Sequence, residues 1–219
     1  MVIVDLSHIV EHGMTTYPGL PAPEIGDHLT REGSRAHYAP GTEFHIGRIR
    51  MVANTGTYVD TPFHRYPEGT DLVTTPLERM VELKGVVVEA LGRSEVDADD
   101  LQARSFAGAA VLIHTGWSRH WGTEAYFAGH PYLTESGAAW LIEQGAALVG
   151  IDSLNIDSTA SGERPAHSAL LAAGIPIVEH LCHLDQLPPE GFRFCAAPVA
   201  VAGLGTFPVR AYAVVGDRT

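Results

Sequence analysis

Four short apolar runs constrain the fold of this chain more than any other feature. They lie at residues 85–90, 109–114, 147–152 and 174–179. Compact apolar runs of this length are typical of strands that are buried in a protein core. Two of them end in a carboxylate, Asp152 and Glu179. Because a buried and unpaired carboxylate costs a large free energy, each of these groups must meet water, a cation or a hydrogen-bond donor.

Helix signals separate the apolar runs. The predicted helices begin at a capping residue or at a proline in the first turn, and two of them are followed by a glycine that ends the helix. They are a short helix after Thr75 and Pro76 to about Val81, one from Asp97 to about Arg104, one over 135–144 capped by Thr134 and followed by Gly145, and one over 165–171 between Pro165 and Gly174.

Further strands are predicted toward the two ends of the chain, at residues 2–8, 44–53, 192–200 and 209–215, with a loop over 203–208. Residues 22–41 contain prolines, glycines and charges without a strong hydrophobic period. Such a segment predicts irregular structure, either a binding loop or an excursion on the surface.

Composition excludes several classes of function. With 219 residues, 45% of them hydrophobic, the chain can bury a substantial core, and a single domain over 1–219 is expected. The formal net charge of −12 argues against nucleic-acid binding, which needs a basic surface. Cys182 and Cys195 are too few for a disulfide framework and are expected to pack as small apolar residues. No signal peptide or membrane-spanning run is apparent, so a cytoplasmic protein is expected.

The residues that can carry chemistry gather between Asn54 and His64, in the sequence Asn-Thr-Gly-Thr-Tyr-Val-Asp-Thr-Pro-Phe-His. Gly56 lets another group approach the backbone, and Pro62 prevents a helix, so Asp60 and His64 project from a stiff corner. A carboxylate can hold a metal ion or orient an imidazole, and an imidazole can bind a metal or carry protons near neutral pH. The same residue types also fit a plain strand end and turn, with Asp60 capping backbone amides and His64 on the surface.

This stretch resembles the motif of the cyclase family, which includes bacterial kynurenine formamidases and isatin hydrolase and in which the motif is roughly His-x-Gly-Thr-His-x-Asp-x-Pro-x-His. Five positions match, and the two leading histidines are replaced by Asn54 and Tyr58. The resemblance covers nearly the whole chain. Other segments that carry it are Asp5-Leu6-Ser7-His8, Tyr17-Pro18-Gly19, residues 150–157, residues 165–179 and residues 205–210.

The resemblance implies a mixed α/β fold of the swivelling β/α/β type, with a largely β core, a few flanking helices and assembly as a homodimer or homotetramer. It also implies that Asp60, His167 and Glu179 bind metal and that His64 carries protons beside the substrate carbonyl. In the family, the two replaced histidines complete a metal site that often holds two ions. Asn54 can still offer a carbonyl oxygen, so one zinc or manganese ion per chain is expected here.

Residues for substrate binding follow from the resemblance and from position in the chain. Tyr17 and Pro18 belong to a loop that, in the family, reaches toward the active site. Trp117 follows a predicted strand at the end where α/β proteins tend to place ligand contacts, although a core aromatic is the commoner explanation. His45 precedes the motif on the same predicted strand and is a candidate substitute ligand.

The implied function is hydrolysis of a carbon–nitrogen bond in a small amide, a formamide like N-formylkynurenine, or a cyclic amide, with metal-activated water. Two alternatives remain. Tyr58, Asp60 and His64 could form a metal-independent acid–base set in a cyclase-like or isomerase-like enzyme, with the phenol donating to an oxyanion. The chain could also bind a small molecule without chemistry. Stoichiometric bound metal favours hydrolysis, and turnover without metal favours the acid–base set.

Overall fold

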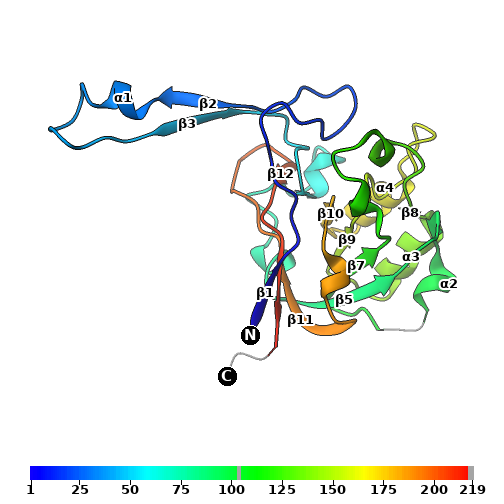
Figure 1. Ribbon diagram of the computed structural model, residues 1–219. Helices are drawn as coiled ribbons and strands as arrows, with labels where there is room; N and C mark the ends of the chain where they lie inside the picture. Colours follow the sequence, from blue (N-terminus) through cyan, green and yellow to red (C-terminus); the bar gives the residue numbers. More distant parts are fainter. Residues whose placement is uncertain (103–104, 217–219) are drawn as a thin grey trace.

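The four apolar runs form the parallel centre of one large sheet in the computed structural model, which describes residues 1–102 and 105–216 (Figure 1). They are β5 (Leu83–Glu89), β7 (Ala109–His114), β9 (Leu148–Ile151) and β10 (Ile177–Glu179), adjacent in that order. The four strand predictions are therefore confirmed. Since parallel strands run in one direction, their carboxyl ends lie along the same edge of the sheet.

Antiparallel strands extend this centre on both sides. The complete nine-stranded order is β1-β13-β11-β5-β7-β9-β10-β4-β12. The added strands are β1 (Val2–Asp5), β13 (Tyr212–Val215) and β11 (Glu190–Cys195) beside β5, and β4 (Tyr58–Asp60) and β12 (Thr206–Pro208) beside β10. A separate parallel pair joins β6 (Glu95–Val96) to β8 (Tyr132–Leu133).

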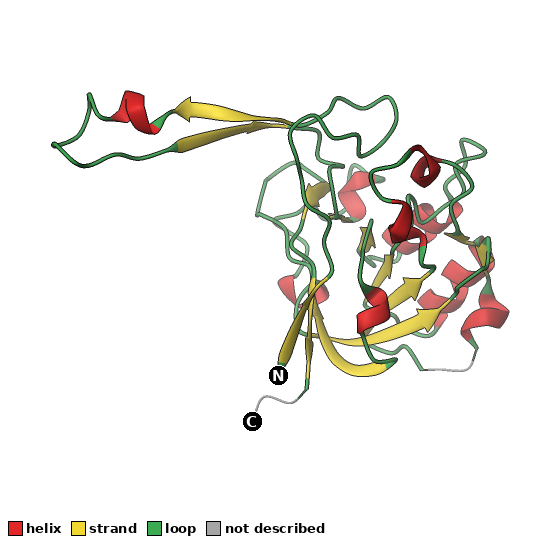
Figure 2. Ribbon diagram, in the orientation of Figure 1, coloured by secondary structure: helices red, strands yellow, loops and turns green. Residues whose placement is uncertain are grey.

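Helices α2 (Ala98–Leu101), α3 (Glu135–Glu143) and α4 (Pro165–Ala172) pack together on one side of the sheet (Figure 2). Asp97 caps α2 with a capping box, and Thr134 caps α3 by accepting from the Gly137 amide, as predicted. The predicted end at Arg104 lies outside the described residues. The helix predicted after Thr75 is instead a single 3-10 turn over Leu77–Arg79, with Pro76 in the capping position and no side-chain cap.

Both faces of the central strands are buried, which explains their continuous apolar sequence. One core lies under the helices and includes Val111 with Leu141 and Leu170. The other lies on the opposite face, where Leu112 joins Leu6, which follows β1, and Phe194 of β11. The mixed α/β fold with a largely β core is confirmed. No helix among the described residues is long and apolar enough to cross a membrane.

The prediction of irregular structure over 22–41 is wrong for residues 24–29 and 31–34, which form a strand and a short helix, but the segment is an excursion on the surface, one of the two predicted alternatives. β2 (Glu24–Leu29) and β3 (Ile46–Arg50) form an antiparallel hairpin that carries α1 (Arg31–Ser34) and projects away from the rest of the molecule (Figure 1). Residues 24–50 are called the arm below. Because nearly all residues of β2 and β3 are exposed, the arm has no buried face to impose an alternating pattern on the sequence.

The predicted loop over 203–208 contains strand β12, and the strands predicted over 192–200 and 209–215 are shorter, ending at Cys195 and beginning at Tyr212. With only three residues, β12 is too short to show a hydrophobic period. Cys182 and Cys195 are free and buried, as expected for small apolar residues.

Candidate active site

Two neighbouring antiparallel strands, β4 and β10, bring the carboxylates of Asp60 and Glu179 close together. β4 pairs with β10 so that Asp60 lies opposite Ile177 and Tyr58 lies opposite Glu179. His64 follows β4 on a 3-10 turn over Pro62–His64, and His167 lies in the first turn of α4. Segments more than 100 residues apart in the chain therefore meet at the pair formed by β4 and β10.

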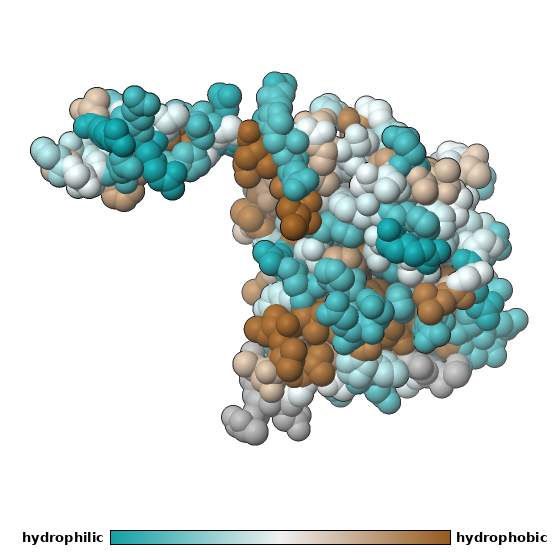
Figure 3. Space-filling model, viewed as in Figure 1, coloured by the Kyte–Doolittle hydropathy of each residue, from teal (hydrophilic) through white to brown (hydrophobic). Residues whose placement is uncertain are grey.

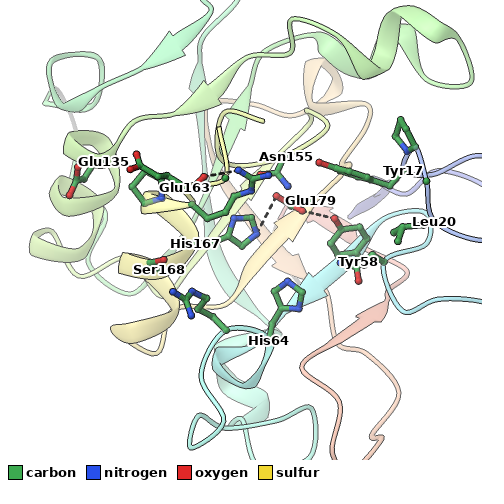
Figure 4. A pocket seen from close by; sticks show the side chains of 17 residues that line it. Tyr17, Leu20, Tyr58, His64, Glu135, Asn155, Glu163, His167, Ser168 and Glu179 are labelled. Carbon is green, nitrogen blue, oxygen red and sulfur yellow. Dashed lines mark hydrogen bonds and ion pairs between the residues drawn. The ribbon is translucent and has the colours of Figure 1, made fainter. Parts of the chain in front are cut away.

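A pocket of about 920 Å³ opens over this cluster (Figure 4). Seven of the nine residues predicted for the site line it: Tyr17, Pro18, Asn54, Tyr58, His64, His167 and Glu179. Asp60 is completely buried beside the lining residues. Trp117 does not line the pocket; its indole nitrogen donates to the Tyr126 carbonyl at 3.0 Å.

The Nε2 atom of His167 is separated from two carboxylate oxygens by distances close to those between ligands of one metal ion. His167 Nε2 lies 3.6 Å from Asp60 Oδ2 and 3.6 Å from Glu179 Oε1. These separations are too long for hydrogen bonds, and Asp60 Oδ2 is buried without a hydrogen-bond partner. Ligands about 2.0–2.1 Å from a tetrahedral zinc ion are themselves about 3.3–3.5 Å apart. The donor set therefore fits a divalent cation.

Asp157 fixes the orientation of His167. Its Oδ2 lies 2.7 Å from His167 Nδ1 and accepts from the His167 amide at 2.9 Å, while Oδ1 accepts from the Ala166 amide at 2.7 Å. With its hydrogen on Nδ1, the neutral ring keeps a lone pair on Nε2 for an ion, which is a common arrangement of metal-binding histidines.

The electrostatics of the cluster require positive charge between the carboxylates. Burial alone would lower the pKa of His167, but the charge of Glu179, hydrogen bonds to Asp157 and Asp60, and the charge of Asp60 raise it to about 10. Burial also raises the pKa of Glu179 to about 7, although the charge of His167 lowers it. A proton satisfies part of this requirement, and a divalent cation would satisfy more of it.

Tyr58 holds Glu179 rather than facing the pocket as a free donor. Its hydroxyl donates to Glu179 Oε2 at 2.6 Å, and the Ile156 amide donates to Glu179 Oε1 at 2.6 Å. Burial, together with the charges of Glu179 and Asp60, raises the pKa of Tyr58 well above its ordinary value. The phenol therefore stays neutral, and a neutral phenol is a poor metal ligand.

Thr206 connects His64 to Asp60. The Thr206 hydroxyl donates to Asp60 Oδ1 and lies 2.7 Å from His64 Nδ1. Because the hydroxyl has a single hydrogen and gives it to the carboxylate, His64 Nδ1 must be the donor in the second contact. The neutral His64 ring then has its lone pair on Nε2. Its side chain is 36% exposed, so it can exchange protons with the pocket.

His64 also lies close enough to be a ligand itself. One ligand atom each from Asp60, His64 and His167 lies within 4.8 Å of the other two, whereas Glu179 approaches the group through His167. The geometry therefore allows two assignments of the third protein ligand, Glu179 or His64. The hydrogen bond of Nδ1 to Thr206 favours His64 as the proton carrier.

Several residues of the site have no clear local signal in the sequence. Thr206 acts across 142 positions of the chain, and the backbone of Gly205 packs so tightly on His64 that an added Cβ would lie 2.1 Å from the His64 amide nitrogen. Asn155 and Arg164 also line the pocket. Asp157 lies in the segment 150–157 that resembles the family and also fits a loop or cap residue, and its contact with His167 depends on the fold.

His45 is not near the site. It lies in the arm, where its Nε2 is 2.6 Å from Asp27 Oδ1. Its position just before β3, ahead of the motif in the chain, does not bring it to the pocket, because the arm projects away from the sheet (Figure 1). The structure therefore gives no support to His45 as a substitute ligand.

Several known proteins are similar to this chain in sequence or in structure. The chain is 29% identical over 210 residues to a kynurenine formamidase of Geobacillus thermodenitrificans, with 95% of each chain covered. Its structure superimposes on isatin hydrolase A from Ralstonia solanacearum with a TM-score of 0.81 and 25% identity, covering 98% of this chain and 92% of that one. A second structure, described as a potential metal-dependent hydrolase with cyclase activity, gives a TM-score of 0.79 and 25% identity over 99% of both chains.

A family model provides the assignment. The Cyclase model matches residues 4–158, which include the motif from Asn54 to His64 and the carboxyl end of β9. This match covers well over half of the chain, and the two solved structures share its fold over nearly their whole length. The chain therefore belongs to the cyclase family.

Proposed function

We propose that the chain is a metal-dependent hydrolase that cleaves the carbon–nitrogen bond of a small amide, of a formamide such as N-formylkynurenine, or of a cyclic amide. The relatives support an amidohydrolase-like enzyme. The observation that carries the proposal is the set of 3.6 Å gaps that separate His167 Nε2 from Asp60 Oδ2 and from Glu179 Oε1. One zinc or manganese ion per chain, held by these residues and by the Asn54 carbonyl oxygen, is the form we propose.

Each residue of the site has its own role in the proposed reaction. A divalent cation bound there would lower the pKa of a water molecule and polarise the substrate carbonyl. His64 Nε2 accepts a proton as the water oxygen bonds to the carbonyl carbon, and returns a proton to the amide nitrogen as the carbon–nitrogen bond breaks. Thr206 and Asp60 hold the His64 ring in the tautomer that this role needs.

The metal-independent alternative assigns the Tyr58 hydroxyl to a developing oxyanion. That hydroxyl is already the donor in a 2.6 Å hydrogen bond to Glu179. Using it for the substrate would leave Glu179 Oε2 buried without its partner, which costs about 1–3 kcal/mol. This contact favours the hydrolase.

Metal content and turnover, measured on the same variants, test the proposal. We expect about one equivalent of zinc or manganese in the wild-type protein and hydrolysis of aryl formamides or cyclic amides that a chelator abolishes. Asp60→Asn should lose both metal and activity. His64→Ala should keep the metal and lose at least about a hundredfold in kcat, as expected for removal of a general acid–base.

The matched control is His45→Ala, which removes an imidazole from the arm and should change neither metal content nor kcat. Turnover by a metal-free wild-type protein would contradict the hydrolase mechanism. Loss of metal in His64→Ala would show instead that His64 is a ligand, and would overturn its assignment as the proton carrier.

A further inference from the structure

Arg164 has no role in the chemistry proposed above, yet it lies in the wall of the pocket just before α4. Its Nη1 donates to three backbone carbonyls, those of Ser158 at 3.1 Å, Ser161 at 2.8 Å and Glu163 at 2.6 Å. The loop therefore wraps around one end of the guanidinium group and fixes its plane. These contacts involve Nη1 alone, and Nε and Nη2 carry further N–H groups.

The guanidinium has no carboxylate partner among the described residues, although it is only partly exposed. The neighbouring Glu163 accepts from it through the backbone carbonyl and not through its side chain. A partly buried cation loses hydrogen bonds to water. An anion that accepts two parallel N–H hydrogen bonds from the guanidinium would replace them. Glu163 and Glu135 also line the pocket, and both residues are exposed to solvent.

Tyr17 adds a second donor beside the guanidinium. Its ring enters the pocket from the loop that precedes the arm (Figure 4). Burial raises the pKa of the Tyr17 hydroxyl, and the charge of Arg164 together with a hydrogen bond from it lowers that pKa. Both residues line the same pocket, so both can donate to one anion bound there.

We propose that Arg164, with the Tyr17 hydroxyl, binds a carboxylate of the substrate, so that the pocket selects an anionic amide over its neutral analogue. The inference rests on the proposed hydrolase function and specifies its substrate class. The planar guanidinium matches the two oxygens of a carboxylate, and an anion held there would lie in the same pocket as His64 and His167.

The test compares formanilide, a neutral aryl formamide, with the ortho, meta and para formamidobenzoates, which have the same scissile bond and add a carboxylate. At least one formamidobenzoate should be hydrolysed by the wild-type enzyme with a kcat/KM about tenfold or more above that of formanilide, the value of one hydrogen bond to a charged group. Arg164→Gln should remove this preference by raising the KM for the formamidobenzoate. It should leave kcat/KM for formanilide within about twofold of the wild-type value. Arg164→Lys should retain part of the preference, because lysine keeps the positive charge but lacks the planar guanidinium that donates two parallel hydrogen bonds.

The matched control is Arg119→Gln, because Arg119 also donates through Nη1 to a carbonyl, that of Gly116, and does not line the pocket. It should leave the preference unchanged. An equal loss for all substrates in Arg164→Gln would show that Arg164 only supports its loop, and would overturn the inference, as would a wild-type enzyme without preference.

Failure of the hydrolase proposal is a separate outcome, since it would leave every formamide intact. Binding of benzoate and of benzamide by calorimetry would then decide on Arg164. The inference predicts that benzoate binds about tenfold tighter than benzamide to the wild-type protein and not to Arg164→Gln. Equal binding of the two ligands to the wild-type protein would contradict it.

Discussion

At the scale of single residues, the two departures from the family motif, Asn54 and Tyr58, change the hydrogen bonding of the Glu179 carboxylate. A histidine in place of Tyr58 would offer a lone pair, whereas the buried phenol offers a hydrogen and gives it to Glu179 Oε2. Tyr58 is also hydrogen-bonded by Asn54, which lines the same pocket. Asn54 and Tyr58 thus form a neutral pair on the side of Glu179 where the family motif has two imidazoles.

Restoring the imidazoles should restore the capacity for a second ion. We expect Asn54→His combined with Tyr58→His to raise the metal content from about one to about two equivalents per chain, because two neutral nitrogen ligands then face the free oxygen of Glu179. Plasma mass spectrometry on the dialysed protein measures this. Tyr58→Phe is the control, since it removes the hydroxyl without adding a ligand, and its metal content should not exceed that of the wild type. A double variant that stays at one equivalent would contradict the prediction.

At the scale of elements, sequence reasoning succeeded where an element carries its own signal. β7 was predicted at its observed bounds because both of its faces are buried, and α3 was predicted because Thr134 caps it. The corner from Asp60 to His64 and the helix–strand unit from His167 to Glu179 were also found. In the arm, β3 lies inside the strand predicted over 44–53, whereas β2 and β12 were missed, because β2 has no buried face and β12 has only three residues.

The supporting contacts of the site could not be predicted from the sequence. Thr206 reaches His64 only because β12 pairs with β4, and this pairing joins residues 146 positions apart. The contact between Asp157 and His167 likewise depends on how the loop after β9 meets α4. Side chains that act through such long-range pairings leave no spacing in the chain that a local pattern could reveal.

The close approach of β12 to the turn after β4 makes a prediction about this element. The Gly205 carbonyl accepts from the Thr61 amide at 2.7 Å, and a Cβ at Gly205 would lie 2.1 Å from the His64 amide nitrogen. We expect Gly205→Ala to push the turn away from β12, to lower the free energy of unfolding by about 1–3 kcal/mol and to lower kcat about tenfold or more through misplacement of His64.

Urea unfolding and steady-state kinetics measure these two effects of Gly205→Ala. Gly26→Ala is the matched control, because a Cβ at Gly26, in the arm, would meet no atom within 4 Å. It should change the free energy of unfolding by no more than about 0.5 kcal/mol. Wild-type stability and kcat in Gly205→Ala would show that the turn and β12 are free to separate without affecting the site.

At the scale of the whole molecule, the arm projects from the body and the rest of the chain does not cover it. It exposes five large hydrophobic side chains, those of Ile25, Tyr38, Phe44, Ile46 and Ile49. An isolated two-stranded hairpin is marginally stable in water. The body has exposed apolar residues as well, at Met1, Val2 and Ile3, and hydrophobic side chains gather beside β1 on the face shown in Figure 3.

The distribution of charge favours a second copy of this chain as the partner that the arm contacts. The arm contains four arginines and four acidic residues, so its formal charge is zero and the net charge of −12 belongs to the rest of the molecule. Two acidic bodies repel each other, whereas the neutral arm can approach an acidic body without that penalty. In a two-fold symmetric dimer, each arm would cover the same surface of its partner.

We therefore predict that the chain forms a homodimer or homotetramer in which the arm carries the contact. Residues 24–50 can be replaced by a short glycine–serine linker, because Glu24 and Arg50 are paired in the hairpin and so lie about 5 Å apart. Light scattering after size exclusion should find the wild type as an oligomer and the linker variant as a monomer with unchanged circular dichroism from the sheet.

Ile25→Ser combined with Ile49→Ser removes one apolar cross-strand pair and keeps the hairpin. This double variant should shift the equilibrium between oligomer and monomer toward the monomer, while Arg48→Gln should not. A wild-type protein that is monomeric at all concentrations, or a linker variant that still assembles, would show that the arm does not hold two copies together.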